Sequence, residues 1–208
     1  MKKTMMLATL ALSLGASAVH AGDKSSDPVA LKKATALMKQ DFKSTGIATV
    51  DRLDQDQAMA VCTKYRGDPP ADIARELQAA QMALIKYPAD GKYMGDWKNG
   101  DKIAKSGRGA TWRDKPDTVN GGGCYNCHRV SGTELSYGTI GPSLYQFGKL
   151  RGGPTEANMK YVYGKLYDSQ AYVPCSNMPR FGYHGVLTEQ QMKDLTALLL
   201  DPESVVNQ

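Results

Sequence analysis

A mainly α-helical fold is predicted for this chain of 208 residues, and three observations predict it. Apolar residues recur at helical spacing in several segments, and capping residues or prolines stand where those segments begin. The alternation of apolar and polar residues that indicates β-strands is absent from the sequence. Hydrophobic residues make up 41% of the chain, which is enough for a buried core in one or two domains.

Residues 1–21 have the composition of a secretory signal peptide. Lys2 and Lys3 precede a mostly apolar stretch, and residues 19–21 form a small-residue cleavage site, with residues 16–18 as an alternative. The apolar run is shorter than the ~18–20 residues that span a bilayer, so cleavage is favoured over a membrane anchor. We therefore expect export to the periplasm and a mature protein without a membrane span.

Residues 22–92 are predicted to form a helical extension. Asp27 and Pro28 mark the start of a first helix that Gly46 would end, a second helix is expected over residues 54–65, and a third after Pro70. The apolar residues at helical spacing are Leu31, Ala34, Met38 and Phe42 in the first helix, and Ile73, Leu77, Ala80 and Leu84 in the third. No recognisable site lies here, and we expect a helical layer packed on the domain that follows.

Residues 93–208 are predicted to form a second, mainly helical domain. Helices are expected over residues 97–106 and 156–166, with irregular chain between about 130 and 153. The final helix has the clearest start, because Thr188 and Gln191 form a capping box. Leu187 and Met192 form a hydrophobic staple, and Pro202 follows the end of the helix.

The chemistry of the chain is carried by the motif Cys124-Tyr125-Asn126-Cys127-His128. Cys-x-x-Cys-His is the attachment signature of c-type haem, in which two thiols add to the haem vinyl groups and the histidine binds iron. A thioredoxin-like dithiol would require a βαβ context, and a zinc site would require further Cys or His ligands nearby. The sequence therefore predicts a class I cytochrome c-like haem domain over residues 93–208, with one covalent haem c.

A methionine is the expected sixth iron ligand, because a thioether there raises the reduction potential. The candidates after the motif are Met159, Met178, Met192 and His184. Pro179 biases Met178 to an extended conformation in a loop, whereas Met159 and Met192 fall in predicted helices. We predict that His128 and Met178 ligate the iron. Ordinary core packing is the alternative for each methionine.

Pro142 and Leu144 follow the motif and are predicted to contact the haem site. The Pro142 carbonyl is a candidate acceptor for the second N–H of His128, and Leu144 a candidate for packing on the macrocycle. An ordinary turn is the alternative for both. Cys62 and Cys175 are predicted to form a disulfide, because four cysteines in an oxidising compartment leave these two to pair. A reactive thiol near the haem is the alternative.

Six stretches of this sequence closely resemble the SoxX family of monohaem cytochromes. They are residues 93–97 (YMGDW), 106–109 (SGRG), 124–128 (CYNCH), 137–144 (YGTIGPSL), 176–182 (SNMPRFG) and 187–191 (LTEQQ). The resemblance covers about residues 80–207, and the stretches around Met178 and the final helix distinguish this family from other cytochromes c.

The resemblance implies the electron-transfer subunit of a periplasmic SoxAX complex, an L-cysteine S-thiosulfotransferase that oxidatively joins thiosulfate to a cysteine of the SoxYZ carrier protein. The implied partners are a SoxA-like cytochrome subunit, which holds the reacting haem, and a small soluble cytochrome c as electron acceptor. By position, Cys124 and Cys127 would hold haem, and His128 and Met178 would ligate its iron.

Two other functions remain open at this point. A free periplasmic electron shuttle would need little beyond the haem domain, and an independent haem enzyme such as a peroxidase would need an open sixth position. Nucleic-acid binding is not predicted, because the net charge is only +5 and no arginine-rich stripe or basic-aromatic platform occurs.

Overall fold

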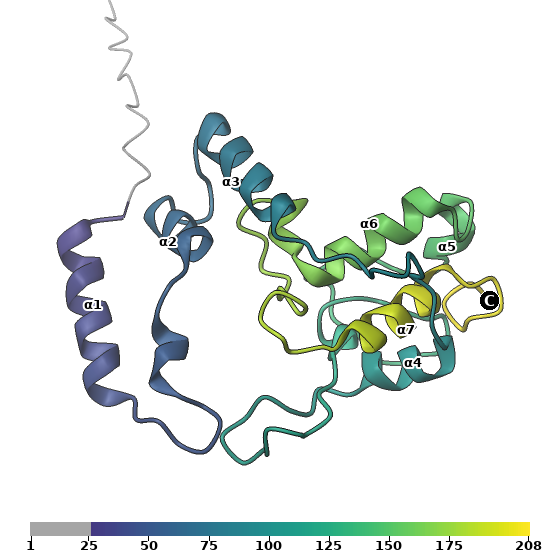
Figure 1. The fold of residues 1–208 in the computed structure, drawn as a ribbon, viewed down its shortest axis with the longest axis horizontal. Coiled ribbons are helices and arrows are strands. Elements are labelled where there is room, and N and C mark those ends of the chain that lie inside the picture. Colours follow the sequence, from purple (N-terminus) through teal and green to yellow (C-terminus); the bar gives the residue numbers. More distant parts are fainter. Residues whose placement is uncertain (1–25) are drawn as a thin grey trace, which may run out of the picture.

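The computed structural model describes residues 26–208, which fold as helices joined by irregular chain and contain no β-strand (Figure 1). The signal peptide predicted for residues 1–21 lies outside the described residues. The α-helices are α1 (Pro28–Asp41), α2 (Gln57–Lys64), α3 (Ala71–Ala83), α4 (Trp97–Lys105), α5 (Phe147–Arg151), α6 (Glu156–Tyr167) and α7 (Glu189–Leu200). Short 3₁₀ turns are η1 (Val50–Leu53), η2 (Cys124–Asn126) and η3 (Ser169–Ala171). None of the described helices is long and apolar enough to cross a membrane.

Helix α1 forms where the sequence predicted it but does not pack as predicted. Asp27 caps its start by accepting a hydrogen bond from the Val29 N–H (2.9 Å). The helix ends at Asp41 rather than at Gly46, because Phe42 leaves the helical conformation. No residue of α1 is buried, and Figure 1 shows the helix standing apart from α4, α6 and α7. The expectation of a packed layer is wrong for α1, whose Leu37 and Met38 side chains are exposed, as is that of Phe42 at its C-terminal cap.

Helices α2 and α3 do pack on the C-terminal half. Ala58 of α2 and Leu77 of α3 are buried, and α3 lies against η3, just before the loop that carries Met178. Asp56 begins α2 by accepting a hydrogen bond from the Met59 N–H (2.8 Å). The extension therefore reaches the second domain through its second and third helices.

The hydrophobic core lies in the C-terminal half, where α7 packs against α4 and α6 (Figure 1). The capping box of Thr188 and Gln191 is present as predicted, and Leu187 and Met192 are both buried in this core. Gly100 lets α4 approach α7 closely, because a Cβ there would lie 2.2 Å from the Asp194 carbonyl oxygen. Burial of the final helix thus fixes α4, whose C-terminal end leads to the haem motif.

Asp194 of α7 ties the start of α4 to the core. Its carboxylate is 2% exposed, yet it accepts hydrogen bonds from the Asp96 N–H (2.9 Å), the Asn99 side chain (2.5 Å) and Gln190 (2.8 Å). A buried charge is tolerated when hydrogen bonds replace its water shell. Three donors meet that requirement here.

Helix α5 was not predicted, since residues 130–153 were expected to be irregular. It has only five residues, and Gln146 (φ 58°) and Gly152 (φ 82°) bound it in the left-handed conformation. Gly148 places it against the end of α7, where a Cβ would lie 2.8 Å from the Leu199 carbonyl oxygen. Such a short helix depends on this contact for its stability. Its five residues are also too few to show the apolar periodicity from which a helix is predicted.

Candidate functional site

A run of three glycines, Gly121 to Gly123, packs against and hydrogen-bonds to the end of α4 just before the Cys-x-x-Cys-His motif. The N–H groups of Gly122 and Gly123 donate to the carbonyls of Ile103 (2.9 Å) and Ser106 (2.8 Å). A Cβ on Gly121 would lie 2.0 Å from the Ser106 carbonyl oxygen, and Gly123 adopts a left-handed conformation (φ 56°). Glycine is favoured at Gly121 by the close approach and at Gly123 by the left-handed backbone. The run therefore determines where the motif begins.

The two cysteines of the motif are held by one short turn. Turn η2 begins at Cys124, whose carbonyl accepts hydrogen bonds from the N–H groups of Cys127 (3.1 Å) and His128 (2.9 Å). Both thiols are free of disulfides. Burial raises the pKa of the Cys124 thiol to about 11, so this thiol is neutral at pH 7. The described residues contain no β-strand, so the βαβ context of a thioredoxin-like dithiol is missing from them.

His128 is oriented by the loop that follows the motif. Its Nδ1 lies 2.7 Å from the Pro142 carbonyl oxygen, and because a carbonyl can only accept, Nδ1 carries the proton. Gly141 makes room for the ring, since a Cβ there would lie 2.2 Å from His128 Cε1. This leaves Nε2 as the nitrogen available to a metal, which is the arrangement expected of a metal-binding histidine. The contact predicted for the Pro142 carbonyl is therefore present.

Arg129, the residue after His128, has a hydrogen-bond donor without a partner. Its Nε is buried without a hydrogen-bond partner, and its guanidinium lies over the rings of Tyr145 (4.7 Å) and Tyr137 (5.6 Å). An anionic group of a bound cofactor, such as a haem propionate, would satisfy that donor. With two free thiols and an oriented imidazole beside it, these residues fit a covalently attached haem.

Met178 lies in the loop between η3 and α7, as predicted. Its carbonyl accepts a hydrogen bond from the Ser169 hydroxyl (2.5 Å), and its N–H donates to the Ser176 hydroxyl (3.2 Å). The side chain is half-buried and packs against the same hydrophobic core as Cys124 and Leu144. The predicted loop placement is therefore present, and ligation of iron by Met178 stays a prediction.

The other candidates for the sixth ligand have different environments. Met192 is 3% exposed in the interior of α7, where its sulfur would lie 2.9 Å from a Cβ on Gly182. Met159 belongs to α6 and packs on the core from that helix. His184 is exposed, and its ring meets the Tyr183 ring edge-on with 5.0 Å between centroids.

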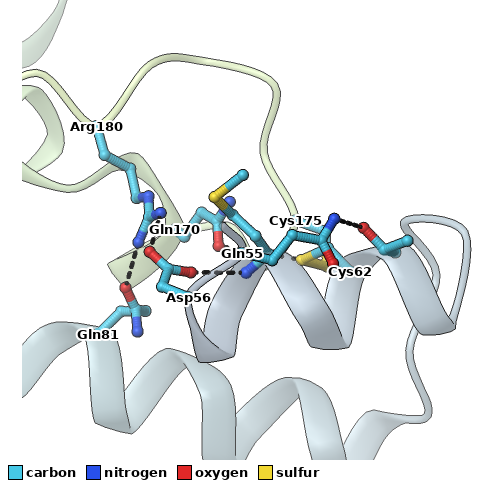
Figure 2. Close-up of a disulfide and its surroundings, with 9 residues drawn as sticks. Gln55, Asp56, Cys62, Gln81, Gln170, Cys175 and Arg180 are labelled. Atoms are coloured by element: carbon cyan, nitrogen blue, oxygen red, sulfur yellow. Dashed lines mark hydrogen bonds and ion pairs between the residues drawn. A yellow bond between two sulfur atoms is a disulfide. The ribbon is translucent and has the colours of Figure 1, made fainter. Parts of the chain in front are cut away.

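The structure joins Cys62 to Cys175 in a disulfide with 5.3 Å between the Cα atoms (Figure 2). Cys62 lies in α2 of the extension and Cys175 three residues before Met178, so the bond links sequence positions 113 residues apart. The alternative of a reactive thiol is excluded while this bond is intact. The extension is thereby attached to the loop that carries the predicted ligand.

Arg180 makes a second connection between the extension and this loop, and the sequence did not reveal it. Figure 2 shows its guanidinium between Asp56 and Gln81: it donates to the Gln81 amide oxygen (3.1 Å) and forms an ion pair with the Asp56 carboxylate. Burial opposes ionisation of Asp56, yet the Met59 N–H and Arg180 hold the pKa of this carboxyl below its usual value. Arg180 is 4% exposed, so these acceptors replace the water that its guanidinium loses on burial.

The disulfide gives a direct prediction for thiol chemistry. Haem-loaded protein that is denatured without reductant should yield no alkylated cysteine, and reduction should yield two. Serine at both Cys62 and Cys175 should lower the free energy of unfolding by about 4–5 kcal/mol in the chain-entropy model, because a long loop is no longer closed. Mass spectrometry and denaturant titration measure the two effects; an alkylated Cys175 in unreduced protein would contradict the pairing.

Comparison with known proteins supports the haem interpretation of the motif. The family model for cytochrome c matches residues 108–201, which contain Cys124, Cys127, His128 and Met178. The chain is also 33% identical over 214 residues to a protein of Aquifex aeolicus (strain VF5) that is described as an uncharacterized lipoprotein. That similarity covers 99% of both chains, so the relative includes a counterpart of the extension.

Proposed function

We propose that this chain, which belongs to the cytochrome c family and so binds haem c covalently, is the electron-transfer subunit of a periplasmic SoxAX-type complex. The family accounts for covalent haem and electron transfer. The finer assignment to oxidative conjugation of thiosulfate rests on the resemblance of residues 80–207 to SoxX. The signal peptide predicted for residues 1–21, the disulfide and the relative described as a lipoprotein all favour export.

Two side chains suited to ligate iron support electron transfer. The Pro142 carbonyl leaves His128 Nε2 available, and Met178 stands on a loop at the hydrophobic core that Cys124 also contacts. Haem c held by Cys124 and Cys127 supplies one-electron iron redox chemistry when bound. His128 and Met178 would fill both axial positions, so the chain would exchange electrons with partners and would not bind a substrate at the metal.

The proposed reaction determines how many electrons the chain must accept. Forming a sulfur–sulfur bond between thiosulfate and a carrier thiol releases one proton and two electrons. A single haem accepts one electron at a time, so this subunit would pass them on in two steps. The thiol chemistry itself is assigned to the SoxA-like subunit, because Cys62 and Cys175 are paired and Cys124 and Cys127 are committed to haem.

The proposal is tested by reconstitution with separately purified partners. The haem-loaded chain alone, given SoxYZ-like carrier, thiosulfate and oxidised small cytochrome c, should form no carrier thiosulfonate. Conjugation should begin when a SoxA-like subunit is added, and it should fall when Met178 is changed to Ala although the partner is intact. Mass spectrometry of the carrier measures the product.

The outcomes separate this function from the free shuttle. A SoxA-like cytochrome that co-purifies with the chain from periplasm supports the complex. Electron exchange with soluble cytochromes, without any effect on conjugation in the presence of SoxA-like subunit, would identify a shuttle instead. Conjugation by the chain alone would overturn the assignment of an electron-transfer subunit.

A further inference from the structure

The loop that carries Met178 is held on both sides by the helical extension. Before Met178, the disulfide joins Cys175 to Cys62 of α2. Two residues after Met178, Arg180 reaches Asp56 at the start of α2 and Gln81 of α3. The haem domain also holds this loop, since the Ser169 hydroxyl donates to the Met178 carbonyl (2.5 Å) and Phe181 is buried in the core.

The Arg180 contacts form a buried polar unit in which each member has a defined partner. One guanidinium nitrogen faces the Asp56 carboxylate and another faces the Gln81 amide, while the plane lies over the Tyr183 ring at 4.4 Å. Arg180 and Gln81 are each 4% exposed. A planar guanidinium with fixed acceptors defines one position for the backbone that bears it.

A methionine ligand on a loop depends on how that loop is held. A thioether is a weak ligand of ferric iron, so Met178 would stay on the iron only while its loop does not open to admit another ligand. The apparent affinity of a competing ligand is proportional to the open fraction of the loop. Contacts that exist only in the closed loop therefore lower that affinity. The Arg180 contacts exist only in the closed loop, because Asp56 and Gln81 belong to the extension and not to the loop.

We propose that Arg180, with Asp56 and Gln81 of the extension, positions Met178 on the haem iron, so that the extension serves to hold the axial ligand. This inference rests on the proposed ligation by Met178. It assigns α2 and α3 a role in the chemistry, although neither helix contributes a haem-binding residue. Arg180 is a positioning residue that acts through the loop backbone.

Asp56→Asn is the sharpest variant for a test. Asparagine keeps the cap of α2, since it caps helices as well as aspartate does, but it removes the charge that faces Arg180. Gln81→Met is a second variant, which keeps the side-chain length and removes the acceptor. Asp90→Asn is the matched control, because it also removes a carboxylate from an ion pair, but that pair is with Lys193 on α7 and not with the Met178 loop.

Imidazole is the probe, added to the oxidised, haem-loaded full chain. Loss of the sulfur-to-iron charge-transfer band reports displacement of Met178. Asp56→Asn and Gln81→Met should each bind imidazole about tenfold more tightly than the wild type, in line with the loss of a charge-assisted hydrogen bond. Asp90→Asn should bind it with the wild-type affinity. A purely structural role would lower the unfolding midpoint without changing imidazole affinity at low denaturant.

The results distinguish the positioning role of Arg180 from the assignment of Met178 as the iron ligand. A wild-type band together with unchanged imidazole affinity in both Asp56→Asn and Gln81→Met would overturn the positioning role and leave Met178 as the ligand. Absence of the band from the wild type would overturn both. Tighter imidazole binding in the two variants, with an unchanged control, would establish that the extension holds the ligand loop.

Discussion

Changing Cys124 or Cys127 to Ala should reduce the yield of haem-loaded protein severely, and changing both should abolish it. Each thiol forms one thioether, so a single variant loses one of two covalent bonds and the double variant loses both. Haem staining of a denaturing gel after acid-acetone extraction measures what remains attached. Wild-type protein should retain its haem through that treatment, because the thioethers are covalent.

The control for this experiment is the pair Cys62 and Cys175. Serine at both positions removes two cysteines without touching the motif, so haem should stay attached although the protein unfolds more easily. The alkylation pattern gives a second check, since haem-free protein should expose Cys124 and Cys127 as two additional thiols after denaturation. Haem that extracts freely from the wild type would contradict covalent attachment.

Met178→Ala should abolish the sulfur-to-iron charge-transfer band and lower the reduction potential. A thioether raises the potential of haem iron, and axial ligands cover a range of about 0.8 V, so a decrease on the order of 0.1 V or more is expected. Redox titration monitored by absorbance measures the potential. The vacated position should also bind imidazole without competition.

Met192→Ala is the matched control, because it removes the same side chain from the core. Met192 is 3% exposed in α7, so its loss should cost about 2–5 kcal/mol of unfolding free energy through the cavity it leaves. The charge-transfer band of the folded protein should be unchanged. A lost band in Met192→Ala with an intact band in Met178→Ala would reverse the assignment of the ligand.

Local features of the sequence were enough to predict most helices and the attachment motif. The capping box at Thr188 and the proline at Pro28 act within one helical turn, so the residues that start these helices lie next to each other in the chain. The cysteine spacing is equally local. The hydrogen bond between His128 and the Pro142 carbonyl could also be predicted, because 14 positions separate the two residues within a single loop.

Long-range packing was where prediction from sequence failed. The apolar stripe of α1 was expected to be buried, yet no residue of that helix is. Periodicity shows that a helix has an apolar face but not whether another element lies against it. Helix α5 was not predicted, because its five residues have no periodic pattern of their own. The helix is supported by contact with α7.

The sequence by itself determined which residues are suited to hold a haem, since the attachment signature is defined by residue types at fixed spacing. Only the tertiary structure decided what holds those residues in place. Arg180 meets Asp56 across 124 positions of the chain. The disulfide closes a similar span, and it was predicted from the cysteine count and not from any local pattern around Cys62 or Cys175. Neither residue type is unusual in its local context. Partners this far apart in sequence are brought together by the packing of α3 against η3, which no local pattern encodes.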